Sequence, residues 1–176
     1  MNNRHQYGFT LIELIAVIVI LGIIAAVSVP KLTNLSDAAM TARLKDLQGK
    51  LRSISIMVHG LAAVNDQLNG ESIIVIDGDT IELQSGYPHA QWLGGMRFLM
   101  NRPNQGPTNP SAVCTTDWCA RGDQTSLPSN GVSVAGEGRI LKIFPLGYTF
   151  QQACSVYYIN PANGSAPTID IEVADC

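Results

Sequence analysis

Charged side chains are scarce in this 176-residue chain: they make up 14% of it, and no run of like charge occurs. With a formal net charge of −3, the sequence lacks the basic stripe that is typical of proteins that bind duplex nucleic acid. We therefore expect no nucleic-acid partner. Apolar residues, in contrast, reach 46%, which is high for a soluble protein. The length leaves room for one domain with a core, or for one domain and an extended element.

Motifs for catalysis and cofactor binding are absent as well. The sequence contains no Gly-rich phosphate loop, no nucleophile elbow and no metal-binding helix motif. Its three histidines, His5, His59 and His89, do not make a catalytic set. Asp77 and Asp79 flank a turn glycine, but they lack enough further ligands nearby for a calcium site. We expect no enzymatic activity, no cofactor and no bound metal.

The apolar residues are concentrated near the N-terminus. Within residues 9–30 the only charged side chain is Glu13. Because a helix rises about 1.5 Å per residue, such a segment matches the hydrocarbon layer of a membrane, which is about 30 Å thick. The preceding residues, 1–8, are polar and include Arg4. The positive-inside tendency then predicts that this end lies in the cytoplasm and that the chain after the apolar segment lies outside.

The helical pattern continues beyond the apolar segment. Pro30 should bend the helix rather than end it, because apolar residues recur afterwards at steps of three and four. These residues form one face of a helix: Met40, Leu44, Leu47, Leu51, Ile54, Val58 and Leu61. The second half of the helix, residues 31–68, is therefore amphipathic and needs a domain to lie on. The first half, residues 9–30, needs lipid or other helices.

The remaining residues, 69–176, predict a head made largely of strands. Asn69-Gly70 ends the helical region, and residues 73–76 and 80–84 are typical of a hairpin around Asp77-Gly78-Asp79. Gly86-Tyr87-Pro88 is expected to break the second strand. Further along, the sequence predicts a short helix at 89–101, a loop over 102–131 closed by two cysteines, and strands at 139–146, 153–160 and 167–174. The predicted fold class is α+β, with a long N-terminal α-helix packed on a four- to five-stranded antiparallel sheet.

Four cysteines lie in the far half of the chain, at Cys114, Cys119, Cys154 and Cys176. An even number in an exported domain favours disulfides. Four cysteines allow three pairings, of which the most local, Cys114–Cys119 with Cys154–Cys176, is favoured. A zinc site is the competing interpretation, although the sequence has no Cys-x-x-Cys pair and the histidines lie far off.

The stretch Gly8-Phe9-Thr10-Leu11-Ile12-Glu13-Leu14, followed by the apolar run, resembles the class III signal of type IV pilins and the related pseudopilins. The resemblance covers residues 8–30. It implies that residues 1–8 are a leader peptide, that a membrane aspartyl peptidase, the prepilin peptidase, cuts between Gly8 and Phe9, and that the new amine of Phe9 is methylated. The protein would be the substrate of this enzyme.

A carboxylate in the apolar segment needs a reason, because burying an ionised carboxylate in a bilayer costs at least a few kcal/mol. After cleavage, the α-amino group of Phe9 lies about 6 Å from Glu13 along the helix. The resemblance implies that the preferred partner of Glu13 is the amine of a neighbouring subunit. Since such a pair is favourable only in the right register, it would act as a check on alignment during assembly. The apolar residues that would supply affinity are Leu11, Ile12, Leu14, Ile15, Val17 and Ile18.

Two plainer interpretations compete for the N-terminus. It could be an ordinary signal peptide cleaved near Ala26-x-Ser28, but its apolar run exceeds the usual length of about 7–15 residues and has a carboxylate near its start. It could also be a signal anchor that holds an enzyme at the membrane. In that case the free energy needed to place the Glu13 carboxylate in the membrane would have no explanation.

The C-terminal part carries a second resemblance. A strand opened by Cys154, a Pro/Asn/Gly turn, an alternating strand and the final Cys176 look like the disulfide-bounded loop of type IVa pilins. The hairpin before Gly86-Tyr87-Pro88 resembles pilins of the mannose-sensitive haemagglutinin type. These resemblances imply a homopolymeric pilus fibre that serves adhesion, assembled by an inner-membrane platform from a precursor whose head lies in the periplasm. The alternatives are a minor pilin or a pseudopilin of a type II secretion system; major pseudopilins typically bear an acidic calcium-binding loop at this end.

Overall fold

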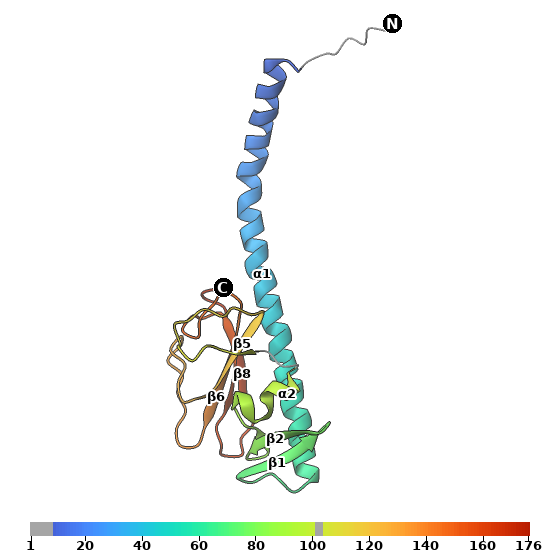
Figure 1. The fold of residues 1–176 in the computed structure, drawn as a ribbon, viewed down its shortest axis with the longest axis vertical. Coiled ribbons are helices and arrows are strands. Elements are labelled where there is room, and N and C mark those ends of the chain that lie inside the picture. The colour runs from blue at the N-terminus through green and yellow to red at the C-terminus, as the bar shows by residue number, and fades with distance from the viewer. Residues whose placement is uncertain (1–8, 101–103) are drawn as a thin grey trace. The chain divides into compact units, whose positions relative to one another are not determined.

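The computed structural model describes residues 9–100 and 104–176, except for the side chains of residues 27–34 and 104. The chain divides into two compact units, one up to Met40 and one from Thr41 to Cys176. We call the second unit the head. A single helix, α1 (Leu11–Val64), belongs to both units (Figure 1).

Helix α1 contains 54 residues and continues through Pro30, as predicted. It ends at Val64, a few residues before the expected boundary at residue 68. Asp66 adopts a left-handed conformation with φ 57°, and the N–H of Gln67 donates to the carbonyl of Ala62 at 2.8 Å. This arrangement is a Schellman motif, which satisfies the last carbonyls of a helix and turns the chain away. The helix end therefore depends on a local cap formed by an aspartate instead of the more usual glycine.

In the first unit, the described side chains of α1 are almost all apolar and exposed. Among the described residues, no helix has both the length and the hydropathy needed for a membrane span. The span expected from the sequence, residues 9–30, includes residues 27–30, whose side chains lie outside the described part of the chain. It stays a prediction.

In the head, one face of α1 is buried against the sheets. Leu44, Leu51 and Val58 are fully buried, which confirms the predicted apolar face. The last predicted member is wrong: Leu61 is 39% exposed, and Ala62 is buried in its place. Ala62 follows Val58 by four residues and so lies on the same face, where a small side chain lets the hairpin approach closely.

A three-stranded antiparallel sheet packs on the end of α1. Its strands are β1 (Glu71–Ile76), β2 (Asp79–Gln84) and β3 (Tyr87–Pro88), in the order β1-β2-β3. The predicted hairpin is confirmed, since Asp77 and Gly78 both have positive φ, as the tight turn between two twisted strands requires. The core here consists of Val58, Ala62, Ile74, Ile81 and Leu83.

The second strand ends at Gln84, before Gly86-Tyr87-Pro88, as expected, but Tyr87–Pro88 form a short strand of their own. Ser85 and Gly86 form a second tight turn, with φ of 52° and 78°, and Tyr87–Pro88 pairs back onto β2. Gly86 leaves no room for a side chain, because a Cβ there would lie 2.8 Å from Leu68. The ring of His59 on α1 stacks on Tyr87 with ring centroids 4.1 Å apart, which ties β3 to the helix.

The short helix expected at residues 89–101 is present in two pieces. A π-helical turn, η1 (Trp92–Met96), is followed directly by α2 (Arg97–Leu99). Gly95 interrupts the helical geometry with φ 139° and packs against Ile81 of β2. Trp92 and Met96 are buried, so this segment contributes to the core as the apolar pattern predicted.

The larger sheet has five strands in sequential order. They are β4 (Asn104–Gln105), β5 (Trp118–Gln124), β6 (Arg139–Pro145), β7 (Ser155–Asn160) and β8 (Thr168–Glu172). β4 is parallel to β5, and all other pairs are antiparallel. The predicted fold class is confirmed: a long N-terminal helix and a largely antiparallel sheet, to which the hairpin sheet is added.

The prediction of an unstructured loop over residues 102–131 is wrong, because β4 and β5 lie within it. β5 contains Gly122 and Asp123, which have low strand propensity, and its structure comes from pairing with β6. Gly122 is needed at its position, since a Cβ would lie 2.5 Å from the backbone nitrogen of Trp92.

The main core lies between α1 and the inner face of the larger sheet. Leu51 of the helix packs in one cluster with buried residues of every long strand: Ala120, Leu141, Ile143, Val156, Tyr158 and Ile169. Gln48 and Arg52 of α1 each donate a hydrogen bond to the carbonyl of Ile169, at 3.0 and 3.2 Å. The helix is thereby attached directly to β8.

Candidate assembly site

The start of α1 is organised by Thr10 and Glu13. Both the backbone N–H and the hydroxyl of Thr10 donate to Oε2 of Glu13 at 3.0 Å, and the backbone N–H of Glu13 donates to Thr10 Oγ1 at 3.4 Å. This is a capping box, in which the cap residue and the third helical residue satisfy each other's free donors. The Glu13 carboxylate is thus held by its own helix end, while the side chain stays exposed.

Of the predicted site residues in this region, Phe9 is 91% exposed just before the helix, and Gly8 lies outside the described residues. Phe9 and Glu13 were expected from the sequence, whereas Thr10 was not. A signal for it exists, because Thr-x-x-Glu before an apolar run is the sequence signature of a capping box. Glu13 therefore has a structural partner in its own subunit in addition to the role expected for it between subunits.

The surface beyond the cap is apolar on all sides. Every large hydrophobic side chain from Phe9 to Ile24 is at least 47% exposed: Phe9, Leu11, Ile12, Leu14, Ile15, Val17, Ile18, Val19, Ile20, Leu21, Ile23 and Ile24. Contiguous apolar surface of this kind marks a region that contacts protein or membrane. A Cβ added at Gly22 would meet nothing within 4 Å, so this position offers a flat surface for close approach.

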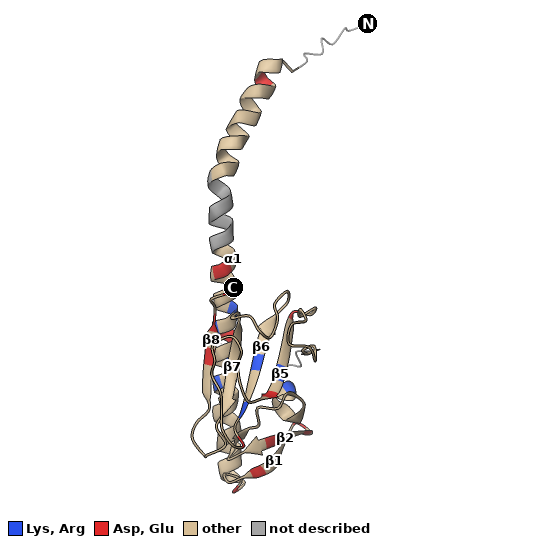
Figure 2. Cartoon of the chain, turned by 90° about the vertical axis from the view of Figure 1, so that its left-hand side faces the viewer, with Lys and Arg blue, Asp and Glu red and all other residues tan. Residues whose placement is uncertain are grey.

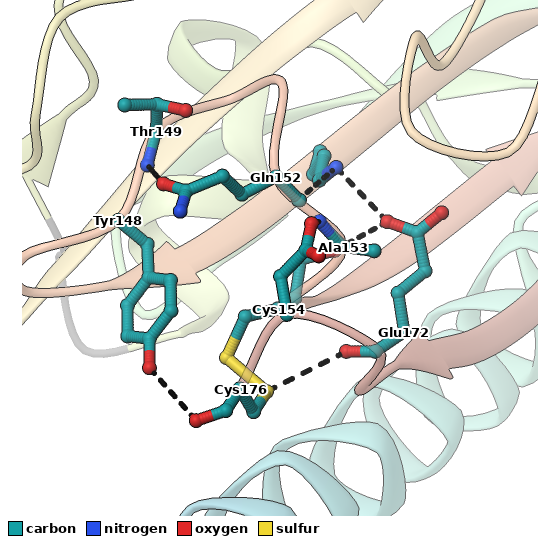
Figure 3. Close-up of a disulfide and its surroundings, with 10 residues drawn as sticks. Tyr148, Thr149, Gln152, Ala153, Cys154, Glu172 and Cys176 are labelled. Carbon is teal, nitrogen blue, oxygen red and sulfur yellow. Dashed lines mark hydrogen bonds and ion pairs between the residues drawn. A yellow bond between two sulfur atoms is a disulfide. The ribbon is translucent and has the colours of Figure 1, made fainter.

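The C-terminus of the head is closed by a disulfide between Cys154 and Cys176, with sulfur atoms 2.11 Å apart (Figure 3). The hydroxyl of Tyr148 donates to the carbonyl of Cys176 at 3.1 Å. Ala153 and Asp175 exchange two hydrogen bonds, one from the Ala153 N–H to the Asp175 carboxylate at 2.6 Å and one from the Asp175 N–H to the Ala153 carbonyl at 3.1 Å. The last residues are therefore held at three points.

A buried ion pair lies beside this disulfide. Lys142 of β6 is completely buried, and its Nζ lies 2.9 Å from Oε2 of Glu172 on β8. Lys142 also donates to Ser129 Oγ at 2.7 Å and to the Gln152 carbonyl at 2.9 Å. Ser129 and Ser155 both donate to the Glu172 carboxylate. Because every hydrogen-bonding group of the pair has partners, the two charges are stable in the interior.

Burial lowers the pKa of Lys142, and the carboxylate of Glu172 opposes this shift. The pair was not expected from the sequence. Its signal was a lysine among the apolar residues of a predicted strand, Ile140, Leu141, Ile143 and Phe144, which indicates either an outward-facing position or a buried partner. The partner is 30 residues away along the chain, so only the sheet pairing identifies it.

The second disulfide joins Cys114 and Cys119, with sulfur atoms 2.12 Å apart. Both cysteines are buried in a satellite core that also contains Leu127, Ile140, Phe144, Phe150 and Ile159. The structure thus has the most local of the three pairings, with none of the four cysteines free. Across the two described ranges, no three His, Cys, Asp or Glu side chains are grouped to hold a metal ion.

The two histidines among the described residues, His59 and His89, both lie within the head. His59 Nδ1 lies 3.0 Å from the carbonyl of Gly86, in addition to its stacking on Tyr87. His89 lies between β3 and η1, and burial lowers its pKa.

Comparison with known proteins identifies a known motif in the N-terminal segment. Residues 3–29 match the prokaryotic N-terminal methylation motif. The type II secretion system core protein G of Pseudomonas aeruginosa is 44% identical over 55 residues, which are 31% of this chain and 37% of that protein. The type IV narrow pilus major component PilA5 of Thermus thermophilus is 48% identical over 46 residues, which are 26% of this chain and 40% of that protein. The chain therefore spans at most 40% of the length of either relative. No solved structure is significantly similar to the chain.

One relative is a pilus component and the other is a secretion-system protein, so the similarity includes both pilins and pseudopilins. The long N-terminal helix and the α+β head agree with this similarity. The N-terminal segment of the chain is therefore similar to that of type IV pilins and pseudopilins, and it carries their class III signal.

Proposed function

We propose that the chain is the structural subunit of a type IV pilus fibre that serves surface adhesion. A prepilin peptidase cuts between Gly8 and Phe9, and the new α-amino group of Phe9 is methylated. The mature subunit then polymerises through the first half of α1. The observation that carries the proposal is the apolar surface of residues 9–26, which has a single carboxylate, Glu13, at its start.

The apolar surface must be covered by lipid before assembly and by neighbouring helices afterwards. Before assembly the segment 9–30 is inserted in the inner membrane, with the head in the periplasm. In the extracellular fibre, neighbouring helices replace the lipid. Because lipid tails are as apolar as these side chains, the hydrophobic effect does not drive this exchange, and helix packing and polar contacts do. The open surface at Gly22 supports close packing of this kind.

Glu13 supplies the polar contact. In the isolated subunit its carboxylate is bonded to Thr10, which lowers the cost of placing it among apolar residues. A carboxylate accepts more than two hydrogen bonds, so Oε1 can receive the amine of Phe9 from an adjacent copy without breaking the cap. The amine exists only after cleavage, and for this reason cleavage controls assembly.

The partners that follow from this proposal are other copies of the chain, the prepilin peptidase and an inner-membrane assembly platform. The chain itself is a structural protein, like the pilin and pseudopilin to which it is similar. A minor pilin or a pseudopilin of a type II secretion system would use the same first helix. The disulfide Cys154–Cys176 favours a pilus subunit, because it closes the end at which major pseudopilins typically have an acidic calcium-binding loop.

The test is to shear cells, pellet the released fibres and sequence the N-terminus of the subunit. We expect the protein in the sheared fraction, starting at N-methylated Phe9. A subunit that starts at Met1, or one found only in membranes, contradicts the proposal. A pseudopilin would stay in the cell envelope, and its deletion would stop protein secretion without removing surface fibres.

A further inference from the structure

The head has opposite charges at two separate places. Residues 41–52 of α1 contain four basic side chains, Arg43, Lys45, Lys50 and Arg52, against the single acid Asp46. Residues 65–91, which include β1 and β2, contain five acids, Asp66, Glu71, Asp77, Asp79 and Glu82, and no lysine or arginine. Figure 2 shows this acidic end on β1 and β2.

The basic segment forms one wall of a groove of about 420 Å³, which we call the helix groove. It is lined by Ala42, Arg43, Asp46, Leu47, Lys50 and Trp118. The guanidinium of Arg43 lies 5.0 Å above the ring of Trp118, and Lys50 pairs with Asp46 at 2.6 Å. The groove therefore contains two apolar side chains, Leu47 and Trp118, together with Arg43 and the Lys50–Asp46 ion pair.

The acidic end has the complementary pattern. On the outer face of the hairpin, Glu71, Ile73 and Val75 follow one another at every second position of β1, and Glu82 lies opposite Ile73 on β2. Ile73 and Val75 are 56% and 68% exposed. We call these four residues the hairpin face. β1 is also the edge strand of its sheet, and an exposed apolar edge strand is a common site of self-association.

One chain cannot place its own hairpin face in its own helix groove. The groove lies along residues 42–50 of α1, whereas the hairpin packs around Val58 and Ala62. Lys50 and Val58 alone are separated by about 12 Å along the helix. A contact between two different surfaces of identical copies is heterologous, and repeated without closure it gives an open helical filament.

We propose that the hairpin face of one copy docks in the helix groove of a second copy, with the acids of the hairpin facing Arg43 and Lys50 and with Ile73 and Val75 facing Trp118 and Leu47. This inference rests on the proposed function, since it names one head contact between the subunits of the fibre. It supplies a head-to-head interaction in addition to the packing of the N-terminal helices.

The test uses the full chain in cells, with four variants. The charge of the groove is reversed by Arg43→Glu with Lys50→Glu. The charge of the hairpin face is reversed by Glu71→Lys with Glu82→Lys. A fourfold variant combines both changes. Lys45→Glu is the matched control, because Lys45 is a basic residue of the same helix that does not line the groove. Sheared fibre and membrane-bound subunit are measured for each variant.

We expect each reversal to lower the fibre yield about ten-fold while the amount of subunit in the membrane stays unchanged, since like charges then oppose each other. The fourfold variant should recover to within about three-fold of the wild type, and Lys45→Glu should stay within about two-fold. Unchanged yields after either reversal, or a fourfold variant as defective as the reversals, would overturn the inference.

A second measurement does not depend on how the variants fold. A zero-length carbodiimide reagent joins lysine amines to carboxylates in the wild-type protein, and mass spectrometry then identifies the linked peptides. A link from Lys50 to Glu71 or Glu82 supports the contact; its absence from intact fibres contradicts it. If the wild type forms no fibre, the proposed function fails, whereas such a link in the membrane fraction would still support a contact between copies.

Discussion

The carboxylate of Glu13 accepts two hydrogen bonds from Thr10, one from the backbone and one from the hydroxyl, each 3.0 Å long. A residue expected to pair with a neighbouring subunit is therefore already oriented by its own helix. The free energy of capping and the free energy of assembly depend on the same side chain, and the two contributions can be separated by mutation.

Replacing Thr10 with alanine should weaken the helix start and leave the charge of Glu13 in place. Loss of such a cap costs about 0.5–2 kcal/mol. We expect a reduced fibre yield and faster exchange of the first amide hydrogens of α1 in detergent-solubilised subunit. Thr10→Ser keeps the hydroxyl and should behave like the wild type; if serine is as defective as alanine, the hydroxyl is not the reason.

Replacing Glu13 with valine should leave a stable membrane protein that assembles poorly, because the aligning charge is gone. The measurement is the ratio of sheared fibre to membrane-bound subunit. Glu13→Gln serves as the control, since it keeps the shape and much of the cap but not the charge. If valine allowed normal fibre formation, alignment by charge would have to be abandoned.

Gly8→Ala should permit membrane insertion and slow or block cleavage, because the resemblance places the peptidase site at the bond after residue 8. An immunoblot should show the precursor accumulating at the size of the uncut chain. Normal processing of this variant would place the cleavage site elsewhere.

Removal of the two disulfides should have graded effects. Cys154–Cys176 spans a separation of 22 residues and Cys114–Cys119 a separation of 5. Loop entropy then predicts that Cys176→Ser lowers the free energy of unfolding by about 3 kcal/mol and Cys114→Ser by about 2 kcal/mol. Chemical denaturation of the solubilised mature chain measures both values. An unchanged midpoint for Cys176→Ser would show that the pairing does not stabilise the head.

Replacing Glu172 with glutamine should leave the Lys142 ammonium buried without a counter-charge. Breaking a buried pair in this way costs about 3–5 kcal/mol, whereas replacing both partners by apolar residues is often nearly neutral. We therefore expect Glu172→Gln to unfold at much lower denaturant concentration and the double variant Lys142→Met, Glu172→Leu to recover most of the loss. Equal destabilisation by the single and double changes would show that packing, and not charge, is decisive.

The sequence predicted best those elements whose signals are local. The amphipathic face of α1 follows from a repeat of three and four residues, and the Asp77-Gly78 turn follows from the φ values that only a few residue types accept. The expected apolar face of α1 is therefore correct as far as Val58. The expected turn is correct at Asp77-Gly78. The pairing of Glu13 with the Phe9 amine of a neighbouring subunit, which the resemblance to type IV pilins implies, stays a prediction.

Features that depend on distant partners could not be predicted in this way. β5 owes its conformation to β6 and to a close approach that Gly122 permits, and its own residues favour a loop. Lys142 is stable in the core because Glu172 lies on a strand two positions away in the sheet. Thr10 is different, since its capping signal is local and was present in the sequence.

The attachment of α1 to β8 has a mechanical consequence. Gln48 and Arg52 of the helix are bonded to Ile169, so tension along α1 enters the head at the last strand. A terminal strand would ordinarily peel from the sheet one hydrogen bond at a time. Here Cys176 is joined covalently to Cys154, next to the start of β7, so the Glu172 end of β8 stays tethered to β7 even where the hydrogen bonds between the two strands open.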